Sequence, residues 1–392
     1  MKAAIIGASR EALHTIEAAK ELGVSIIALD GNAKAEGLAV ADESIVVNIS
    51  NEVATIEALR DRDVDFTLTV PIGRYLTTIG AVNDEFDLDG ISKEAAVNCT
   101  DKYLFHEKLN EKGLRDCECK LVKSGDGDVK MSFPAILKPR YGSGSRAIYF
   151  INNSEELDAA LEDIEDSNED FVLEEAVDGV EYGLDAAVIE GKLDLILLRK
   201  KINTPPPARQ AVGYYAIAKE EAIELYEQVQ GFMEKVVEAL AMDNCLMHAD
   251  IMISEVVQPF LIEVSARPSG HYLHNIFTPF ATGVDVAKEM IKRGIGEEFS
   301  FAPRYYKKSL IRFWDVEDCE VEVVAKREDV VIADNVKLVD YVCNLKKGDR
   351  LGKISGGHSI IDRGYFILEG NDESELEIAA KAIIRRVINN VK

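Results

Sequence analysis

The sequence predicts a multidomain protein of mixed α/β and α+β class. Its 392 residues suffice for two to three domains with substantial cores. The N-terminal segment alternates strand, helix and strand, whereas the middle of the chain holds paired apolar runs joined by turn residues, as in antiparallel hairpins. Hydrophobic residues at 47% and charged residues at 29% are typical of a globular protein.

The N-terminal region predicts a βαβ unit, half of a Rossmann-like fold. Lys2 to Ile6 is a short apolar strand, Glu11 to Leu22 an amphipathic helix and Val24 to Leu29 a second strand. A dinucleotide site would require G-x-G-x-x-G in the first turn. That turn offers Gly7, Ser9 and Ala12 instead, which disfavours NAD or FAD.

A second candidate feature follows the next apolar strand, Phe66 to Val70. It ends in Pro71-Ile72-Gly73-Arg74, and a helix starting there would present Arg74 and free backbone amides to a substrate carboxylate. The alternative is an exposed arginine on a loop.

Cys245 to Gly270 contains two strand-like runs, each with one carboxylate: Asp250 and Glu263. The polar turn between them predicts an antiparallel hairpin in which the two acids converge. Carboxylates among so many apolar side chains are costly without a cation, and oxygen ligands suit a hard ion such as magnesium. Arg267 adds a fixed positive charge. The alternative is a half-exposed hairpin with solvated acids.

Phe133 to Ile151 predicts a strand ending in Lys138, a glycine loop and a second strand from Ala147. Glycines let a backbone approach an anion, and unpaired amides in such a loop point at phosphate oxygens. An ordinary hairpin turn is the alternative, and no P-loop sequence is present. The loop residues are Gly142, Ser143, Gly144 and Ser145, with Arg140 and Arg146 at their base and rim.

Phe171 to Val188 combines an apolar strand start with acidic residues around an Asp178-Gly179 turn. Glu181, beyond the turn, is suited to accept hydrogen bonds from sugar hydroxyls. Backbone groups of residues 175–177 are suited to an adenine edge. By itself the segment also fits a hairpin decorated with acids.

The order of these segments resembles the ATP-grasp superfamily of carboxylate–amine ligases. The resemblance spans about Met1 to Lys392 and is strongest to the branch with L-amino acid ligases, glycinamide ribonucleotide synthetases, biotin carboxylases and carbamoyl phosphate synthases. It implies an ATP-grasp fold with a Rossmann-like N-terminal domain at 1–97, an ATP-grasp domain at 98–300 and a small C-terminal α+β domain at 301–392. It also implies that residues from about 130 to 180 form a mobile lid.

The resemblance implies roles for individual residues. It assigns Lys102, in Thr100-Asp101-Lys102, and Lys138 to the nucleotide phosphates, together with the glycine loop. It assigns Asp250 and Glu263 to the metal and Arg267 to the acyl phosphate or substrate. The adenine and ribose positions are Glu174, Glu175, Ala176, Val177 and, for the ribose, Glu181.

Two positions depart from the family pattern. Many members carry Asn two residues after the second metal acid, where this chain has Ser265, a shorter and weaker ligand. Several relatives have Glu where this chain has Asp250. The first departure tilts the prediction toward the amino acid ligase type and away from the biotin carboxylase type.

The implied reaction uses ATP and magnesium, with manganese as a substitute. A small carboxylate, predicted to be an amino acid, is activated as an acyl phosphate and coupled to an amine, releasing ADP and phosphate. One alternative is a bicarbonate-using carboxylase or carbamoyl phosphate synthase-like enzyme. Another is a non-catalytic ATP-binding module, which the presence of both lysines, both acids and Arg267 disfavours.

The segment from Asn203 to Tyr215 contains three consecutive prolines, which predict a stiff loop and exclude helix and central strand. Lying between the ribose and metal segments, it offers Arg209 and Gln210 for substrate selection. His271, His248 and His274 flank the metal segment as candidate ligands or bases, although a lone histidine is more often structural.

The remaining segments predict supporting structure. Helical spacing over Glu220 to Met242 indicates a packing helix. After Ser300 the sequence predicts a domain of short strands and a final helix, with no acid pair or glycine motif. The strands are expected at 308–313, 321–325, 330–336, 341–342 and 365–368, and the helix at 373–389.

Composition narrows the partners. The net charge of -25 disfavours nucleic acid or an anionic membrane as the main partner. Cys117 and Cys119 have no second pair to complete a zinc site, and reduced thiols in the cytoplasm are expected. No apolar run reaches 18 residues, so neither a membrane span nor a signal peptide is predicted. The resemblance allows a homodimer.

Overall fold

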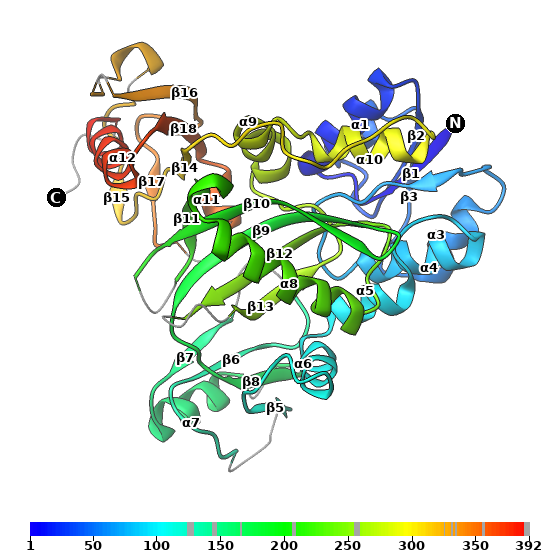
Figure 1. Cartoon of the computed structure of the whole chain (residues 1–392), viewed down its shortest axis with the longest axis horizontal. Helices are drawn as coiled ribbons and strands as arrows, with labels where there is room; N and C mark the ends of the chain where they lie inside the picture. Colours follow the sequence, from blue (N-terminus) through cyan, green and yellow to red (C-terminus); the bar gives the residue numbers. More distant parts are fainter. Residues whose placement is uncertain are drawn as a thin grey trace.

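The structure is a computed structural model of the whole chain. It describes residues 1–123, 129–142, 147–164, 167–205, 209–254, 259–324, 326–330, 332–333, 335–354 and 357–387. Figure 1 shows three structured regions around a large central sheet: an N-terminal α/β region, a small antiparallel sheet and a C-terminal region.

The N-terminal region holds a parallel sheet of order β3-β2-β1-β4. The predicted βαβ unit is confirmed, since β1 pairs in parallel with β2. Its predicted helix is split into η1 (Arg10–Ala12) and α1 (Leu13–Glu21). The predicted strand 66–70 is shorter, because pairing with β1 covers only two residues. The strands are β1 (Lys2–Ile6), β2 (Ser25–Asp30), β3 (Glu43–Val46) and β4 (Phe66–Thr67).

Helices cover this sheet. The region contains α2 (Glu36–Val40), α3 (Glu52–Leu59), α4 (Leu76–Phe86) and α5 (Lys93–Thr100). A much later helix, α10 (Val286–Gly294), returns to lie beside α1 (Figure 1). The N-terminal region is therefore packed against a helix from the part of the chain that forms the central sheet.

The central sheet has eight strands in the order β13-β12-β9-β10-β11-β14-β18-β16. One face packs on α8 (Ile223–Ala239), which confirms the predicted packing helix, and the other on η3 (Leu273–Phe277) and α9 (Thr278–Thr282). The strands are β9 (Val180–Ile189), β10 (Lys192–Asn203), β11 (Ala211–Ile217), β12 (Cys245–Ile253), β13 (Pro259–Ser265), β14 (Ser309–Phe313), β16 (Val336–Cys343) and β18 (Gly364–Gly370).

The small sheet has the order β5-β8-β6-β7 and lies below the central sheet in Figure 1. Helix α7 (Ser154–Asp163) packs on it, and α6 (Lys102–Glu111) leads into it. Its strands are β5 (Cys119–Val122), β6 (Ala135–Pro139), β7 (Tyr149–Ile151) and β8 (Phe171–Glu175).

Residues 171–188 do not form a hairpin. Strand β8 belongs to the small sheet and β9 to the central sheet, so the Asp178-Gly179 turn carries the chain from one sheet to the other. Gly179 has φ +157°, and a Cβ there would lie 2.4 Å from the carbonyl oxygen of Ile253. The crossing therefore requires glycine at this position.

The expected loop from Asn203 to Tyr215 is too long. Strand β10 continues to Asn203 and β11 begins at Ala211, so the connection covers only residues 204–210, of which 206–208 lie outside the described part. Strand β11 pairs with β10 on one side and β14 on the other. The prolines restrict their own backbone but not the apolar run that follows them.

The C-terminal region mainly extends the central sheet, because β14, β18 and β16 continue it past residue 300, and it adds one separate two-stranded sheet. The strand predicted at 330–336 is wrong: β16 begins at Val336 and includes the predicted 341–342. The strand predicted at 321–325 is also wrong. The strand in this part of the chain is β15 (Cys319–Glu320), which ends just before residue 321 and pairs with β17 (Arg350–Leu351). The final helix α12 (Glu373–Val387) confirms the predicted one.

Short elements complete the chain: η2 (Lys219–Glu221), η4 (Arg327–Asp329) and α11 (His358–Ile361). All six cysteines have free thiols. Within the described ranges, no helix is both long and apolar enough to cross a membrane.

Candidate functional site

The predicted metal hairpin forms with its two acids directly opposed. Strands β12 and β13 are antiparallel, and Asp250 is the register partner of Glu263. Opposed residues of an antiparallel pair project from the same face, so the two carboxylates share one face of the central sheet. A bulge follows Asp250 and interrupts the ladder beside the acids.

Lys201 on β10 joins two of the predicted site residues. Its Nζ donates to Asp250 Oδ2 at 2.8 Å and also to Glu181 Oε1, while Asn203 Nδ2 donates to Glu181 Oε2 at 2.7 Å. Neither Lys201 nor Asn203 was predicted. Alternation along β10 places both on one face with Arg199, which is the sequence signal that would have identified them.

This ammonium group controls the charge of its neighbours. Burial by itself would raise the pKa of Asp250, but Lys201, with help from His248 and Arg199, lowers it. Burial would likewise lower the pKa of Lys201, but Asp250 and Glu181 outweigh it and raise that pKa well above its usual value. The pair is therefore ionised at neutral pH.

The acids fit a divalent cation. Oδ1 of Asp250 is buried and has no hydrogen-bond partner in the described structure, so it retains capacity for a ligand. Among described residues, no group of three or more His, Cys, Asp or Glu side chains forms a complete metal cage. Two carboxylates without a cage are the arrangement that magnesium uses when substrate phosphates complete its coordination.

A narrow cavity of about 30 Å³ is lined by six residues that the sequence analysis singled out, and these come from separate parts of the chain. Arg267 fixes its geometry, since Nε donates to Ile72 O at 2.9 Å and Nη1 to Pro268 O at 2.8 Å. The first bond holds the turn that carries Arg74, just before α4. The predicted residues lining this cavity are Arg74, Lys102, Gly142, Glu263, Ser265 and Arg267.

Asp101 secures the base of the glycine loop against helix α6. It caps α6 by accepting from the N–H groups of Tyr103 and Leu104, and it accepts two bonds from Arg140, at 2.8 and 2.7 Å. Lys102, next in sequence, donates from Nζ to Gly142 O at 2.8 Å. Burial lowers the pKa of Lys102, which Glu263 partly offsets.

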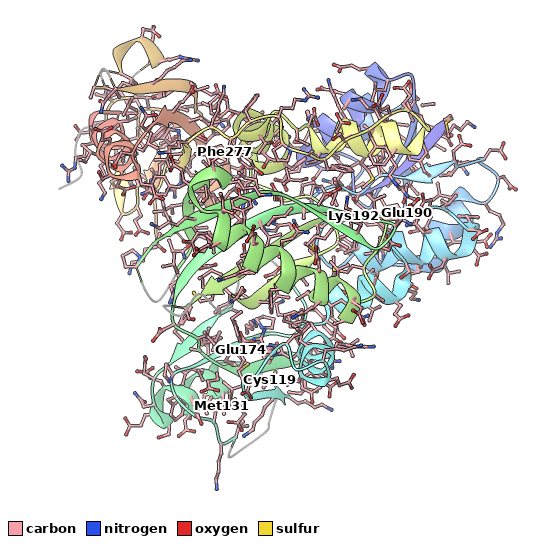
Figure 2. The ribbon with its side chains drawn as sticks, viewed as in Figure 1. Cys119, Met131, Glu174, Glu190, Lys192 and Phe277 are labelled. Atoms are coloured by element: carbon pink, nitrogen blue, oxygen red, sulfur yellow. The ribbon has the colours of Figure 1, made fainter. Side chains whose placement is uncertain are left out.

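Lys138 lies in a buried charge cluster. Its Nζ donates to Glu174 Oε1 at 2.7 Å, and Glu174 Oε2 contacts His106 at 2.5 Å and Arg115 at 3.3 Å. Figure 2 shows Glu174 on the small sheet. Burial alone would raise the pKa of Glu174, but Lys138, His106 and Arg115 hold it well below its usual range. The Glu174 side chain therefore orients Lys138.

The predicted adenine-binding segment is partly engaged by the protein. The N–H of Glu175 donates to Glu118 O at 3.1 Å and that of Ala176 to Pro134 O at 2.9 Å. Val177 follows in the crossing to the central sheet. Three loop residues predicted to meet phosphate, Ser143, Gly144 and Ser145, lie outside the described residues, as does Arg146.

The predicted substrate residues Arg209 and His271 do not line the narrow cavity. Arg209 reaches the small sheet, where its guanidinium lies 5.5 Å from the centre of the Phe150 ring. His271 has φ +60°, and its N–H donates to Glu11 Oε1 at 2.6 Å. Arg209 thus contacts the small sheet and His271 contacts the N-terminal region. Of the three predicted substrate residues, Arg74 lines the narrow cavity.

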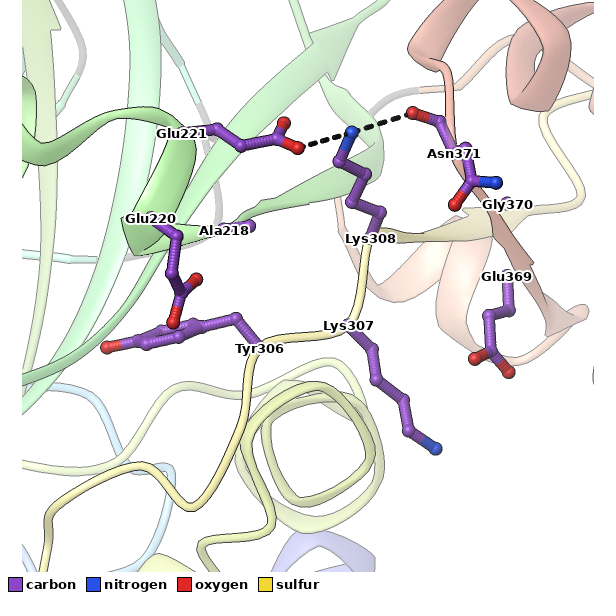
Figure 3. Close-up of a pocket in the computed structure, with 9 residues that line it drawn as sticks. All are labelled: Ala218, Glu220, Glu221, Tyr306, Lys307, Lys308, Glu369, Gly370 and Asn371. Atoms are coloured by element: carbon purple, nitrogen blue, oxygen red, sulfur yellow. Dashed lines mark hydrogen bonds and ion pairs between the residues drawn. The ribbon is translucent and has the colours of Figure 1, made fainter.

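A second cavity, of about 360 Å³, lies away from these residues, between η2 and the end of β18 (Figure 3). Its Lys308 donates to Glu221 at 2.7 Å and to Asn371 O at 2.9 Å. It contains none of the predicted site residues. In this cavity Lys308 links η2 to the segment that follows β18.

The predicted lysines lie on the small sheet (Lys138, on β6) and on the helix that leads into it (Lys102, on α6), and the paired acids lie on the central sheet. The family described as "ATP-grasp domain" matches residues 131–275, which include most of both sheets. The protein therefore contains an ATP-grasp domain in this part of the chain.

Solved structures share the fold over nearly the whole chain. L-amino acid ligase from Bacillus licheniformis superposes with a TM-score of 0.78 at 18% identity, covering 98% of this chain and 96% of that one. Phosphoribosylglycinamide synthetase from Anaerococcus prevotii gives a TM-score of 0.74 at 21% identity, covering 99% and 98%. At these identities the likeness shows the fold.

Curated relatives match in part. Vancomycin B-type resistance protein VanB of Enterococcus faecalis is 28% identical over 125 residues, 30% of this chain and 36% of the relative. The VanA protein of Enterococcus faecium is 23% identical over 48% of this chain and 60% of the relative. D-alanine--D-alanine ligase A of Bacillus cereus is 24% identical over 58% of this chain and 77% of the relative. The chain thus spans about one third of the first relative and three fifths of the second, less than two thirds of each.

Proposed function

We propose that the protein is an ATP- and magnesium-dependent ligase that activates a small carboxylate, an amino acid in our proposal, and joins it to an amine. The observation that carries the proposal is the direct opposition of Asp250 and Glu263, with Glu263 sharing a cavity with Lys102 and Arg267. Glu263, Lys102 and Arg267 thus surround one small space, and Asp250 lies opposite Glu263 on the neighbouring strand, an arrangement suited to phosphoryl transfer.

The proposed reaction activates the carboxylate with ATP before the amine attacks. A carboxylate is anionic and has no leaving group, so an amine does not displace its oxygen directly. If a carboxylate oxygen attacks the terminal phosphorus of ATP, the bond to ADP breaks and an acyl phosphate forms. The amine nitrogen then attacks the carbonyl carbon, the bond to phosphate breaks, and the nitrogen loses a proton. The products are an amide, ADP and phosphate.

The residues divide this work. Lys102 and Lys138 position the phosphates, Arg267 stabilises charge that develops on the transferred group, and Arg74 binds the substrate carboxylate. Asp250 and Glu263 would hold magnesium, which neutralises phosphate charge when bound. Glu181 binds the ribose and Val177, with its neighbours, the adenine. Water must be excluded, because it hydrolyses an acyl phosphate.

The narrow cavity implies that binding moves the two sheets. Its free volume of about 30 Å³ is far below the roughly 300 Å³ of a small ligand pocket. The Lys102–Gly142 bond closes the space from the side of the small sheet. We therefore propose that the base of the glycine loop separates from the central sheet when a nucleotide binds, as part of the proposed lid at about 130–180.

The test is phosphate release from ATP and magnesium by the purified protein. The panel contains single and paired L- and D-amino acids, other small carboxylates with amines, and bicarbonate. D-amino acids are included because one curated relative is named a D-alanine--D-alanine ligase. Release that requires one carboxylate together with one amine, with an amide found by mass spectrometry, supports the proposal.

The bicarbonate arm tests the alternative. Structures named N5-carboxyaminoimidazole ribonucleotide synthetase and biotin carboxylase share the fold at TM-scores of 0.69 and 0.67. Phosphate release with bicarbonate alone would replace our proposal by a carboxylase or carbamoyl phosphate synthase-like reaction. Tight ATP binding without release across the panel would indicate a non-catalytic module.

A further inference from the structure

Four residues form one continuous row across the central sheet. Arg199 on β10, Gly183 on β9, Asp250 on β12 and Glu263 on β13 are successive register partners. Gly183 has no side chain, so the side chains on both sides can lie over it. A Cβ on Gly183 would lie 3.3 Å from Asp250 Oδ1 and 3.7 and 3.8 Å from Arg199 Nη2 and Nε. The guanidinium and the carboxylate therefore face the same small space.

Arg199 is held rigidly in this row. It is 0% exposed, and both of its terminal nitrogens donate to the carboxylate of Asp185, with Nη2 at 2.9 Å from Oδ1. Thr278, the first residue of α9, donates to Asp185 Oδ2 at 2.6 Å. A buried ion pair adds little net stability compared with well-packed apolar side chains. The main effect of the Arg199–Asp185 pair is therefore to fix the orientation of the guanidinium, not to stabilise the fold.

Two polar atoms on either side of Gly183 have no hydrogen-bond partner in the part of the chain that the structure describes. They are the donor Nε of Arg199 and the acceptor Oδ1 of Asp250. Buried polar atoms are normally paired, so two of opposite kind around one gap indicate that the gap has a function. The His248 ring lies beside this gap. Its Nδ1 is 3.5 Å from Arg199 Nη2 and its Nε2 is 3.7 Å from Asp250 Oδ1.

We propose that Asp185 and Arg199 are positioning residues for the metal carboxylate: Asp185 fixes the Arg199 guanidinium, whose positive charge faces Asp250 across Gly183 and orients that carboxylate so that it and Glu263 bind a divalent cation together. The inference rests on the proposed function, because it requires a cation at Asp250 and Glu263. Arg199 acts through Asp250 and contacts neither substrate nor phosphate. Loss of a group that orients a metal ligand typically weakens metal affinity by about 10- to 100-fold.

The test measures Mn²⁺ binding in the presence of ADP, by the loss of the free Mn²⁺ signal in electron paramagnetic resonance. Arg199→Lys keeps a positive charge but loses the two-point contact with Asp185, and should weaken Mn²⁺ binding at least about tenfold. Gly183→Ala keeps the ion pair, places a methyl group into the gap and suits a strand. It should weaken binding similarly, and it keeps the test decisive if the arginine variant fails to fold.

A matched control is available on β14. Arg312 and Asp315 form another largely buried ion pair, at 2.5 Å, that lies outside the row. Asp315→Asn should lower the melting temperature while leaving Mn²⁺ affinity unchanged. Wild-type Mn²⁺ affinity in both Arg199→Lys and Gly183→Ala would overturn the positioning role and leave the proposed function intact. Failure of the wild-type protein to bind Mn²⁺ with ADP would overturn both.

Discussion

Lys201 Nζ and Asp250 Oδ2 lie 2.8 Å apart, although their strands, β10 and β12, are separated by β9. Because the same ammonium also bonds Glu181, it links the proposed metal acid to the proposed ribose acid. Without a bound cation, Lys201 compensates a cluster of carboxylates that would otherwise repel one another. Under the proposed function, a metal at Asp250 and a ribose at Glu181 would compete with Lys201 for these carboxylate oxygens.

The link predicts the effect of Lys201→Met. Without the ammonium, Asp250 and Glu181, both partly buried, lose their charged partner and Glu181 keeps only its bond from Asn203, which costs up to about 3 kcal/mol. The pKa of Asp250 then rises above its unfolded value, so the variant loses stability relative to wild type as pH increases. We expect a melting-temperature deficit that is larger at about pH 7 than at about pH 5.

Lys200→Met is the matched control for that experiment. Lys200 is adjacent in β10 but pairs with the exposed Glu373. An exposed pair contributes less than about 1 kcal/mol, so this variant should stay close to wild type at both pH values. Equal deficits in the two variants would contradict the role of Lys201.

Glu263→Gln tests the metal acid. The amide keeps the shape of the side chain but removes the charge, so phosphate release should fall at least about a hundredfold, because metal stabilisation of phosphoryl transfer is worth several kcal/mol. Circular dichroism and melting temperature should remain near wild type. Glu190→Gln, in the turn between β9 and β10, serves as the control. Turnover like that of wild type would remove Glu263 from the site.

Asp101→Asn tests the attachment of the glycine loop. The variant weakens the cap of α6 and the two bonds to Arg140, so we expect about 1 kcal/mol of destabilisation and a raised KM for ATP. Ser92→Ala removes an ordinary helix cap at α5, where Ser92 accepts from Ala95 N–H at 3.1 Å. That control should lose similar stability with an unchanged KM. A KM shift in both variants would mean that Asp101 has no specific role.

Two buried histidines predict acid sensitivity. Burial lowers the pKa of His106 and of His274 from 6.5 to about 4. The unfolded chain therefore binds protons at a higher pH than the folded chain, and stability falls as pH decreases from about 6.5 to about 4. Each histidine accounts for at most roughly 3 kcal/mol of this loss.

The measurement is the free energy of unfolding in urea across that pH range. His106→Gln and His274→Gln should each flatten the dependence, and the double variant should flatten it further. The Glu174 carboxylate titrates in a lower window, because its pKa is held down by its partners. An unchanged slope in the double variant would show that other groups dominate the acid response.

Local patterns were sufficient for much of the structure. The βαβ unit, the packing helix α8 and the metal hairpin are confirmed, because apolar periodicity and turn residues act over a few residues. One prediction that the structure corrects is the loop at 203–215. Its three prolines led us to expect a loop where β11 already begins at Ala211. The second error concerns β8 and β9, where two adjacent strands join different sheets, and no local pattern shows which sheet a strand enters.

By itself, the sequence determined which side chains were available and how they alternate: Asp250 and Glu263 on the two strands of a hairpin, and Lys201 in step with Arg199 on one strand face. Only the tertiary structure decided that β9 lies between β10 and β12. That order brings Lys201 and Arg199 to Asp250 across Gly183. The physical reason is that strand order depends on pairing between distant segments, whereas alternation depends on the backbone of each strand alone.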